Sequence, residues 1–154
     1  MAVRNQRTIV TFRSTAFNTS ERRAHFINDG CYGDDLARWL MAELAARGTR
    51  TDPEPGQEDF GWYFTYHAGV AHHFIVAFRP EPEPHGLWIG WIERRAGLVG
   101  SILGARRRAI GGDALATIHA ALADSDRVSD VRWHRRTEFE RGNESNGTIH
   151  PHTL

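Results

Sequence analysis

Residues 59–78 (DFGWYFTYHAGVAHHFIVAF) constrain the fold more than any other segment, because aromatic and β-branched residues alternate along them. Two strand-like runs, 59–67 and 70–78, lie on either side of Ala68-Gly69, which predicts a β hairpin. A loop over residues 67–69 would pair Phe64 with His72, and the same register pairs Tyr66 with Val70, Trp62 with Phe74 and Phe60 with Val76. The shared face then consists of Phe60, Trp62, Phe64, Tyr66, Val70, His72, Phe74, Val76 and Phe78. A shift of one residue would scatter this set over both faces, so the pattern predicts a hairpin with one apolar face.

Two helices are predicted. Over residues 34–47, Leu36, Leu40 and Leu44 recur at helical spacing, two aspartates occupy the N-terminal end, and Gly48 follows the last turn. A second helix is predicted over residues 113–123, where Asp113 precedes an apolar stripe. We expect the leucines of the first helix to pack on the aromatic face of the hairpin.

Three further strands are predicted over residues 8–17, 87–93 and 130–134. Residues 49–57 are polar with two prolines and predict a loop, and residues 97–112, with five glycines, predict a mobile or specially bent connection. The order strand, helix, three strands, helix, strand indicates an α+β fold. We expect a two-layer sandwich, with a mainly antiparallel sheet of four to five strands and both helices on one face.

Composition excludes several classes of protein. A chain of 154 residues with 40% hydrophobic residues suits one domain, which we expect over residues 1–140, with a flexible polar tail over 141–154. No apolar run approaches the roughly 20 residues that cross a bilayer, and the single cysteine excludes an internal disulfide, so we expect a cytoplasmic protein without a membrane partner. The 19 basic residues, all arginine, balance 19 acidic residues, so a nucleic-acid partner is not expected.

Nine histidines raise the question of a metal site. Zinc requires three or four converging ligands, whereas neighbouring histidines on a strand point to opposite faces. His67 and His73 could share a face, and His150 and His152 have the spacing of a ligand pair in the predicted tail. These four residues are weak candidates, and we predict neither a metal nor another cofactor.

Four residues are candidates for catalysis. His72 would lie partly buried on the aromatic face, where a neutral imidazole suits a catalytic or pH-sensitive role. Cys31 precedes the first helix, whose dipole favours a thiolate, although the aspartates that follow oppose it. Asp34 and Asp59 each belong to an acidic pair that could act as general acid and base if the fold joined them. Each pair also has a structural explanation, at the start of a helix or of a strand.

Spare aromatic and arginine side chains indicate an interface. Trp88 and Trp91 fall on opposite sides of the strand over residues 87–93, and aromatic residues with arginine anchor protein interfaces. The arginine run after Gly104 lacks a phosphate-loop pattern, which favours solvent or partner contact over nucleotide binding. The predicted contact residues are Trp88, Trp91, Arg94, Arg95, Arg106, Arg107 and Arg108.

We therefore expect a non-enzymatic protein-interaction module, such as an inhibitor or immunity-type binder of another protein, or a homodimer formed through the 87–93 strand. The alternative is a small-molecule enzyme with a pocket between the 34–47 helix and the sheet, using His72, Asp34 or Asp59 as acid or base. Nucleic-acid binding through the arginine run is a third hypothesis, which the balanced charge disfavours.

Overall fold

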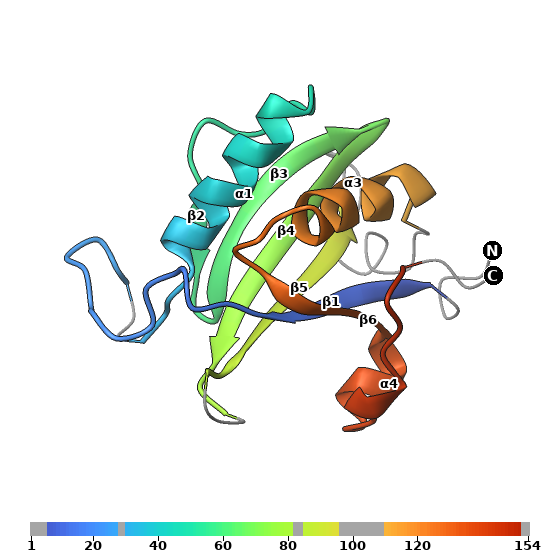
Figure 1. The fold of residues 1–154 in the computed structure, drawn as a ribbon. Coiled ribbons are helices and arrows are strands. Elements are labelled where there is room, and N and C mark those ends of the chain that lie inside the picture. The colour runs from blue at the N-terminus through green and yellow to red at the C-terminus, as the bar shows by residue number, and fades with distance from the viewer. Residues whose placement is uncertain (1–5, 28–29, 82–84, 96–109, 152–154) are drawn as a thin grey trace.

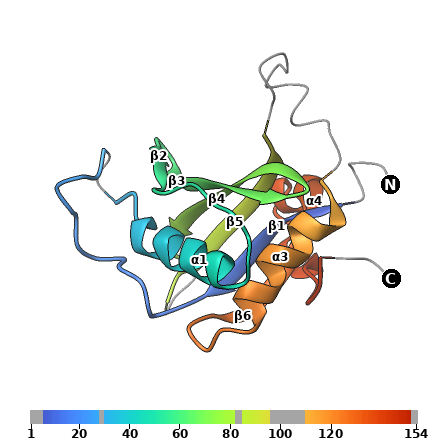
Figure 2. The same cartoon turned by 90° about the horizontal axis from the view of Figure 1, so that it is seen from above.

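The computed structural model describes residues 6–27, 30–81, 85–95 and 110–151. A six-stranded antiparallel sheet carries α1 and α3 side by side on one face (Figures 1 and 2). The elements in chain order are β1 (Arg7–Arg13), α1 (Asp34–Ala46), β2 (Gly56–Glu58), β3 (Gly61–Ala68), β4 (Val70–Arg79), β5 (Leu87–Arg94), α3 (Gly112–Ala123), β6 (Ser129–Arg135), α4 (Arg136–Glu140) and the short 3-10 helix η2 (Glu144–Asn146). The predicted α+β class is confirmed.

The count and order of elements differ from the prediction. The sheet has six strands in the order β2-β3-β4-β5-β1-β6, where four to five were expected, because β2 occupies part of the predicted 49–57 loop. α4 adds a third helix directly after β6. Both additions are too short to leave a periodic pattern in the sequence. Among the described residues, no helix combines the length and apolar character that spanning a bilayer requires.

The hairpin forms with a register two residues away from the predicted one. Phe64 pairs with Phe74 and Tyr66 with His72, and the loop centres on Gly69, whose φ of 79° lies in the left-handed region. Because the shift is an even number of residues, the predicted face survives over most of its length. Val70 and Phe60 are the exceptions, since both are exposed.

The core fills the space between the sheet and the two helices. Leu36, Leu40 and Leu44 of α1 are fully buried in one cluster with Phe64 and Phe74, as expected for a helix seated on the aromatic face. Each such leucine contributes about 1.5–3 kcal/mol through burial. The interface between α1 and the sheet is therefore a packed core.

β1 lies inside the sheet, between β5 and β6. The buried Gln6 just before it binds both backbone groups of Ile110, donating from Nε2 to the carbonyl and accepting from the amide at 2.8 Å. This side chain thus takes the place of a strand partner for the segment that leads into α3.

The segment after Arg141 contacts the edge strand β6. Thr148 forms a two-way backbone bridge with Trp133, with N···O distances of 2.7 and 2.9 Å. The indole of Trp133 is buried and donates to Nδ1 of His119 on α3 at 3.0 Å. The division of the chain at residue 140 and the flexibility of the tail stay predictions.

Candidate functional site

The face of the sheet away from α1 and α3, here called the outer face, carries a row of apolar side chains. Ile9, Trp91 and Ile75 are direct cross-strand neighbours on β1, β5 and β4, and Tyr63 of β3 continues the row. α4 packs over the β1–β6 end of this face, where the ring of Phe139 lies 5.1 Å from that of His134. The row from Ile9 to Tyr63 therefore crosses the middle of the sheet.

Phe60 and Trp91 form the most exposed aromatic pair on the outer face. Their ring centroids lie 5.7 Å apart with an interplanar angle of 27°, and Phe60 is 59% exposed. The turn between β2 and β3 carries Phe60 away from the face on which the sequence placed it. The prediction for Phe60 was wrong because the strand begins only at Gly61.

Polar groups lie beside this pair. The ring centroids of His73 and Tyr63 lie 5.6 Å apart. His73 pairs across the strands with Glu93, whose carboxylate forms an ion pair with Arg136 at 3.1 Å. Burial lowers the pKa of His73, and the charge of Arg95 lowers it further, while Glu93 and other carboxylates act in the opposite direction. A neutral, half-buried imidazole therefore borders the aromatic row.

The predicted contact residues are divided by the fold. Trp88 is fully buried against Phe78 and Phe17 on the helix side, so its side chain is not available to a partner in this structure. Trp91 is half-buried on the outer face. Arg94 shares the side of His72 and Arg95 is exposed at the end of β5, whereas Arg106, Arg107 and Arg108 lie outside the described residues. Strand alternation predicts that the two tryptophans lie on opposite faces of the sheet, but it does not predict which of them is buried.

The catalytic candidates do not converge on one site. Asp34 begins α1 directly after Gly33, which lies against Trp62 and Val76, whereas His72 lies four residues along β4 from Val76. Four residues of strand span about 13 Å. His72 is almost completely buried, with Nδ1 donating to the carbonyl of Val70 at 2.8 Å.

Asp34 instead forms a cluster with two residues that no sequence pattern marked. Its buried Oδ2 accepts from Nε2 of His25 at 2.9 Å and from Arg23 at 3.3 Å, and both partners are about half exposed. Oδ1 is buried and finds no hydrogen-bond partner among the described residues. His25 and Arg23 lie in an irregular segment without periodicity, so no pattern marked them.

Cys31 and Asp59 lie near the β2 end of the sheet. Cys31 is half-buried; its thiol donates to the carbonyl of Glu58 at 3.7 Å, and its own carbonyl accepts from Nε1 of Trp62 at 2.8 Å. Asp59 is exposed in the turn beside Phe60. Cys31 thus serves in this structure to fasten a loop to β2.

Among the histidine candidates, His67 and His73 share the outer face of β3 and β4, as predicted, whereas His150 lies elsewhere. His67 lies on the outer face beside Arg50, at 3.3 Å from its guanidinium, and His150 approaches His119 with ring centroids 5.1 Å apart. His152 is outside the described residues. The parts of the chain that the structure describes hold no group of three or more metal-ligating side chains. Because Nδ1 of His119 accepts the indole N–H of Trp133, that nitrogen is already engaged.

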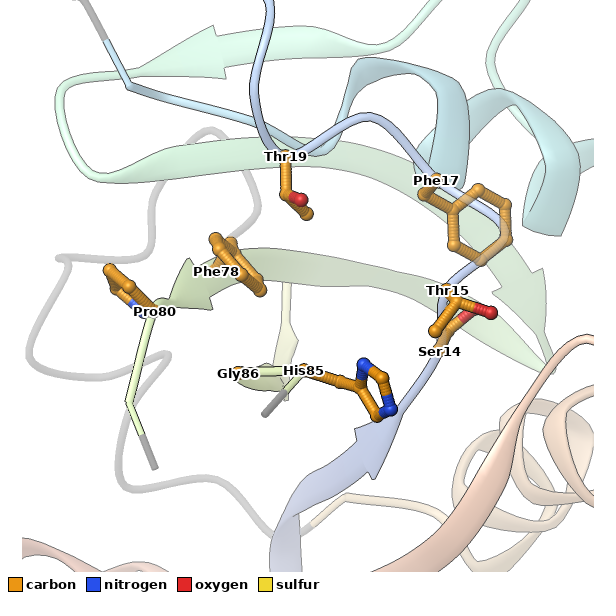
Figure 3. A pocket seen from close by; sticks show the side chains of 8 residues that line it. All are labelled: Ser14, Thr15, Phe17, Thr19, Phe78, Pro80, His85 and Gly86. Carbon is orange, nitrogen blue, oxygen red and sulfur yellow. The ribbon is translucent and has the colours of Figure 1, made fainter. Parts of the chain in front are cut away.

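A separate pocket lies where β1, β4 and β5 meet at one end of the sheet (Figure 3). Its volume is about 320 Å³, at the lower end of the range of ligand pockets. The lining residues are Ser14, Thr15, Phe17, Thr19, Phe78, Pro80, His85 and Gly86. None of them was a candidate site residue from the sequence, because Phe78 belongs to β4 and the others come from irregular segments that no motif connects.

Comparisons of the chain with models of known protein families, with curated proteins and with solved structures gave no match.

Proposed function

We propose that this protein is a protein-interaction module that binds another protein through the outer face, with Phe60 and Trp91 as its anchor. The observation that carries the proposal is the stacked pair itself, in which Phe60 keeps 59% of its surface exposed. Holding a phenylalanine in water is unfavourable, and a partner that covers it recovers the burial energy.

The surroundings of the pair fit an interface. Aromatic residues at the centre of a contact with charged residues at its rim are the usual arrangement of hot spots. Here Trp91 leads to the apolar row across the sheet, and Glu93 with Arg136 and the exposed Arg95 lie at the margin. An inhibitor or immunity-type binder would use such a surface, and self-association through it is the other form that the proposal can take.

The packing of the helix layer favours this function over the enzyme alternative. A pocket between α1 and the sheet would have to lie among Leu40, Phe64 and Phe74, which are all fully buried. His72 and Asp34, its proposed acid and base, sit at different ends of that packed layer.

The test compares two exposed apolar residues. The full chain, isolated untagged from its own host, is weighed by native mass spectrometry, which shows the partner it carries. The affinity of purified variants for that partner is then measured by titration. Phe60→Ser should weaken binding by tenfold or more, whereas Val70→Ser, which alters a 45% exposed valine at the hairpin tip, should stay within twofold of the parent. A monomer that carries no partner, or equal binding by Phe60→Ser and the parent, would contradict the proposal.

A further inference from the structure

His134, near the end of β6, is covered by the segment that follows β6 in the chain, residues 136–151, here called the arm. The arm consists of α4, η2 and the stretch that returns to pair with β6 (Figure 1). At one end of the arm, the ring of Phe139 lies 5.1 Å from the His134 ring. At the other end Gly147 lies against the same ring, since a Cβ added there would be 2.5 Å from Cε1 of His134. Both ends of the arm therefore close over one imidazole.

The two nitrogens of this imidazole have different surroundings. His134 is only 3% exposed, and its Nε2 shares a hydrogen bond with the hydroxyl of Thr11 at 2.8 Å. Nδ1 is also buried and finds no hydrogen-bond partner among the described residues. A neutral imidazole carries one N–H and can place it on Nε2, whereas the protonated form carries a donor on both nitrogens. Protonation under a closed arm would thus bury an unpaired N–H together with a positive charge.

The charged side chains around His134 do not remove this cost. Those on the neighbouring elements and on its own strand are Arg7 of β1, Glu138 of α4, Glu144 of η2, and Arg132 and Arg135 of β6. Both carboxylates are already engaged, Glu138 with Arg135 at 3.4 Å and Glu144 with Arg79 at 2.6 Å. Burial lowers the pKa of His134, and Glu144 acts in the opposite direction. Arg7 lowers this pKa further, while Glu138 raises it.

We propose that the arm is an acid-released switch, in which protonation of His134 detaches the arm from β6 and uncovers the β1–β6 end of the outer face. With the arm detached, water can accept from Nδ1, so the open state binds a proton more readily than the closed state. The closed state therefore loses stability as the pH falls below the ordinary histidine pKa of 6.5. Ile9, the first residue of the apolar row, pairs with His134, so opening would lengthen the accessible row. The switch itself does not rest on the proposed function.

Amide hydrogen exchange of the full chain, corrected for intrinsic rates, measures the opening. Thr148 is the probe, because its amide donates to the carbonyl of Trp133 at 2.9 Å, and Ala37, whose amide donates to Gly33 at 2.8 Å, reports on α1. At pH 7.5 Thr148 should be at least about tenfold less protected than Ala37. At pH 5.5 its protection should be about three- to tenfold lower still, the most that one proton supplies. Equal protection of the two amides would mean that the arm opens only with the whole chain, and would refute the proposal.

Two histidine variants identify the group that titrates. His134→Gln keeps a polar group beside Thr11 but does not titrate, so the protection of Thr148 should change less than about twofold over the same pH range. His150→Gln is the matched control, because His150 also belongs to the arm and its ring lies 5.1 Å from that of His119. It should keep the loss of protection seen in the parent. The proposal is wrong if that loss persists in His134→Gln or disappears in His150→Gln.

Gly147→Ala should open the arm without acid. Gly147 has φ −64° and ψ 144°, which any residue adopts, so the added methyl acts through its collision with His134 and with Cβ of Arg132. At pH 7.5 the protection of Thr148 should fall at least about tenfold. Gly111→Ala, where a Cβ meets nothing within 4 Å, should leave it unchanged. The imidazole of His134, followed by NMR, should titrate below 6.5 in the parent. Titration at or above that value, or equal protection of Thr148 in the two glycine variants, would overturn the proposal.

Discussion

Tyr66 and His72 face each other across β3 and β4, with ring centroids 5.7 Å apart, and both are buried on the helix side of the sheet. The Tyr66 hydroxyl donates to the carbonyl of Ala114 at 2.9 Å and thereby ties β3 to α3. Burial raises the pKa of Tyr66 well above its usual value and lowers that of His72. Both rings are therefore neutral in the folded protein near neutral pH.

The His72 environment predicts loss of stability in mild acid. With its pKa lowered by burial, folded His72 stays unprotonated where the unfolded histidine, near 6.5, takes up a proton. The free energy of unfolding should thus fall as the pH drops from 6.5 towards the folded pKa and be constant above about 7.5. Urea unfolding from pH 5 to 8 measures it. His72→Gln should have a flatter profile than the parent, while the part due to His73 and His134, whose pKa values burial also lowers, should remain. Identical profiles would show that His72 does not contribute.

Replacing Gln6 should expose the cost of two unpaired backbone groups. Gln6→Ala leaves the buried amide and carbonyl of Ile110 without their partner, and we expect the free energy of unfolding to fall by about 2–4 kcal/mol. Gln57→Ala is the control, because Gln57 accepts a single bond from the exposed Ile27 amide, and it should cost less than about 1 kcal/mol. Denaturant unfolding of both variants measures the two losses in free energy of unfolding. The losses would be equal if water replaced Gln6 as the hydrogen-bond partner of the Ile110 backbone.

Gly86 and Gly69 separate the cost of a left-handed backbone from the cost of a steric collision. Both have a positive φ, but a Cβ on Gly86 would lie 2.5 Å from the Phe78 ring and 2.8 Å from the Arg79 carbonyl oxygen, while one on Gly69 would meet nothing within 4 Å. We expect Gly86→Ala to cost about 2–4 kcal/mol, and Gly69→Ala about 1–2 kcal/mol from conformation alone. Thermal or denaturant unfolding of both variants measures the two costs, and equal costs would mean that Phe78 and the Arg79 carbonyl both move aside freely.

Asp34 should control how firmly the segment before α1 is held. Asp34→Asn removes the negative charge that binds His25 and Arg23, so trypsin should cut after Arg22 and Arg23 several times faster than in the parent. Asp124→Asn, which breaks the exposed pair with Arg47, should leave this rate unchanged. Equal cleavage of the parent and Asp34→Asn would show that the cluster does not restrain the segment.

Periodic segments account for what the sequence could predict. The two predicted helices, α1 and α3, begin and end within one residue of their predicted limits; for α1 the leucine spacing and Gly48 after it leave little freedom. The shared face of Trp62, Phe64 and Tyr66 was also correct, since strand alternation survives an even shift of register.

The remaining features depend on contacts that have no periodic pattern. Turn geometry at Gly69 set the register, and the turn before Gly61 sent Phe60 to the outer face. The partners of Asp34 and most of the residues that line the pocket come from irregular segments, which only the folded chain brings together. Sequence reasoning could indicate half-buried aromatics but could not choose between Trp88 and Trp91.

The interior position of β1 has a consequence for synthesis on the ribosome. β1 leaves the ribosome before every other strand, yet its neighbours β5 and β6 follow only after α1 and three further strands have been made. Val10 and Phe12 must therefore stay uncovered while β3, β4 and β5 assemble from local hairpins. During that interval the nascent chain presents an apolar strand to chaperones and to neighbouring chains, and slow translation before β5 would lengthen the exposure.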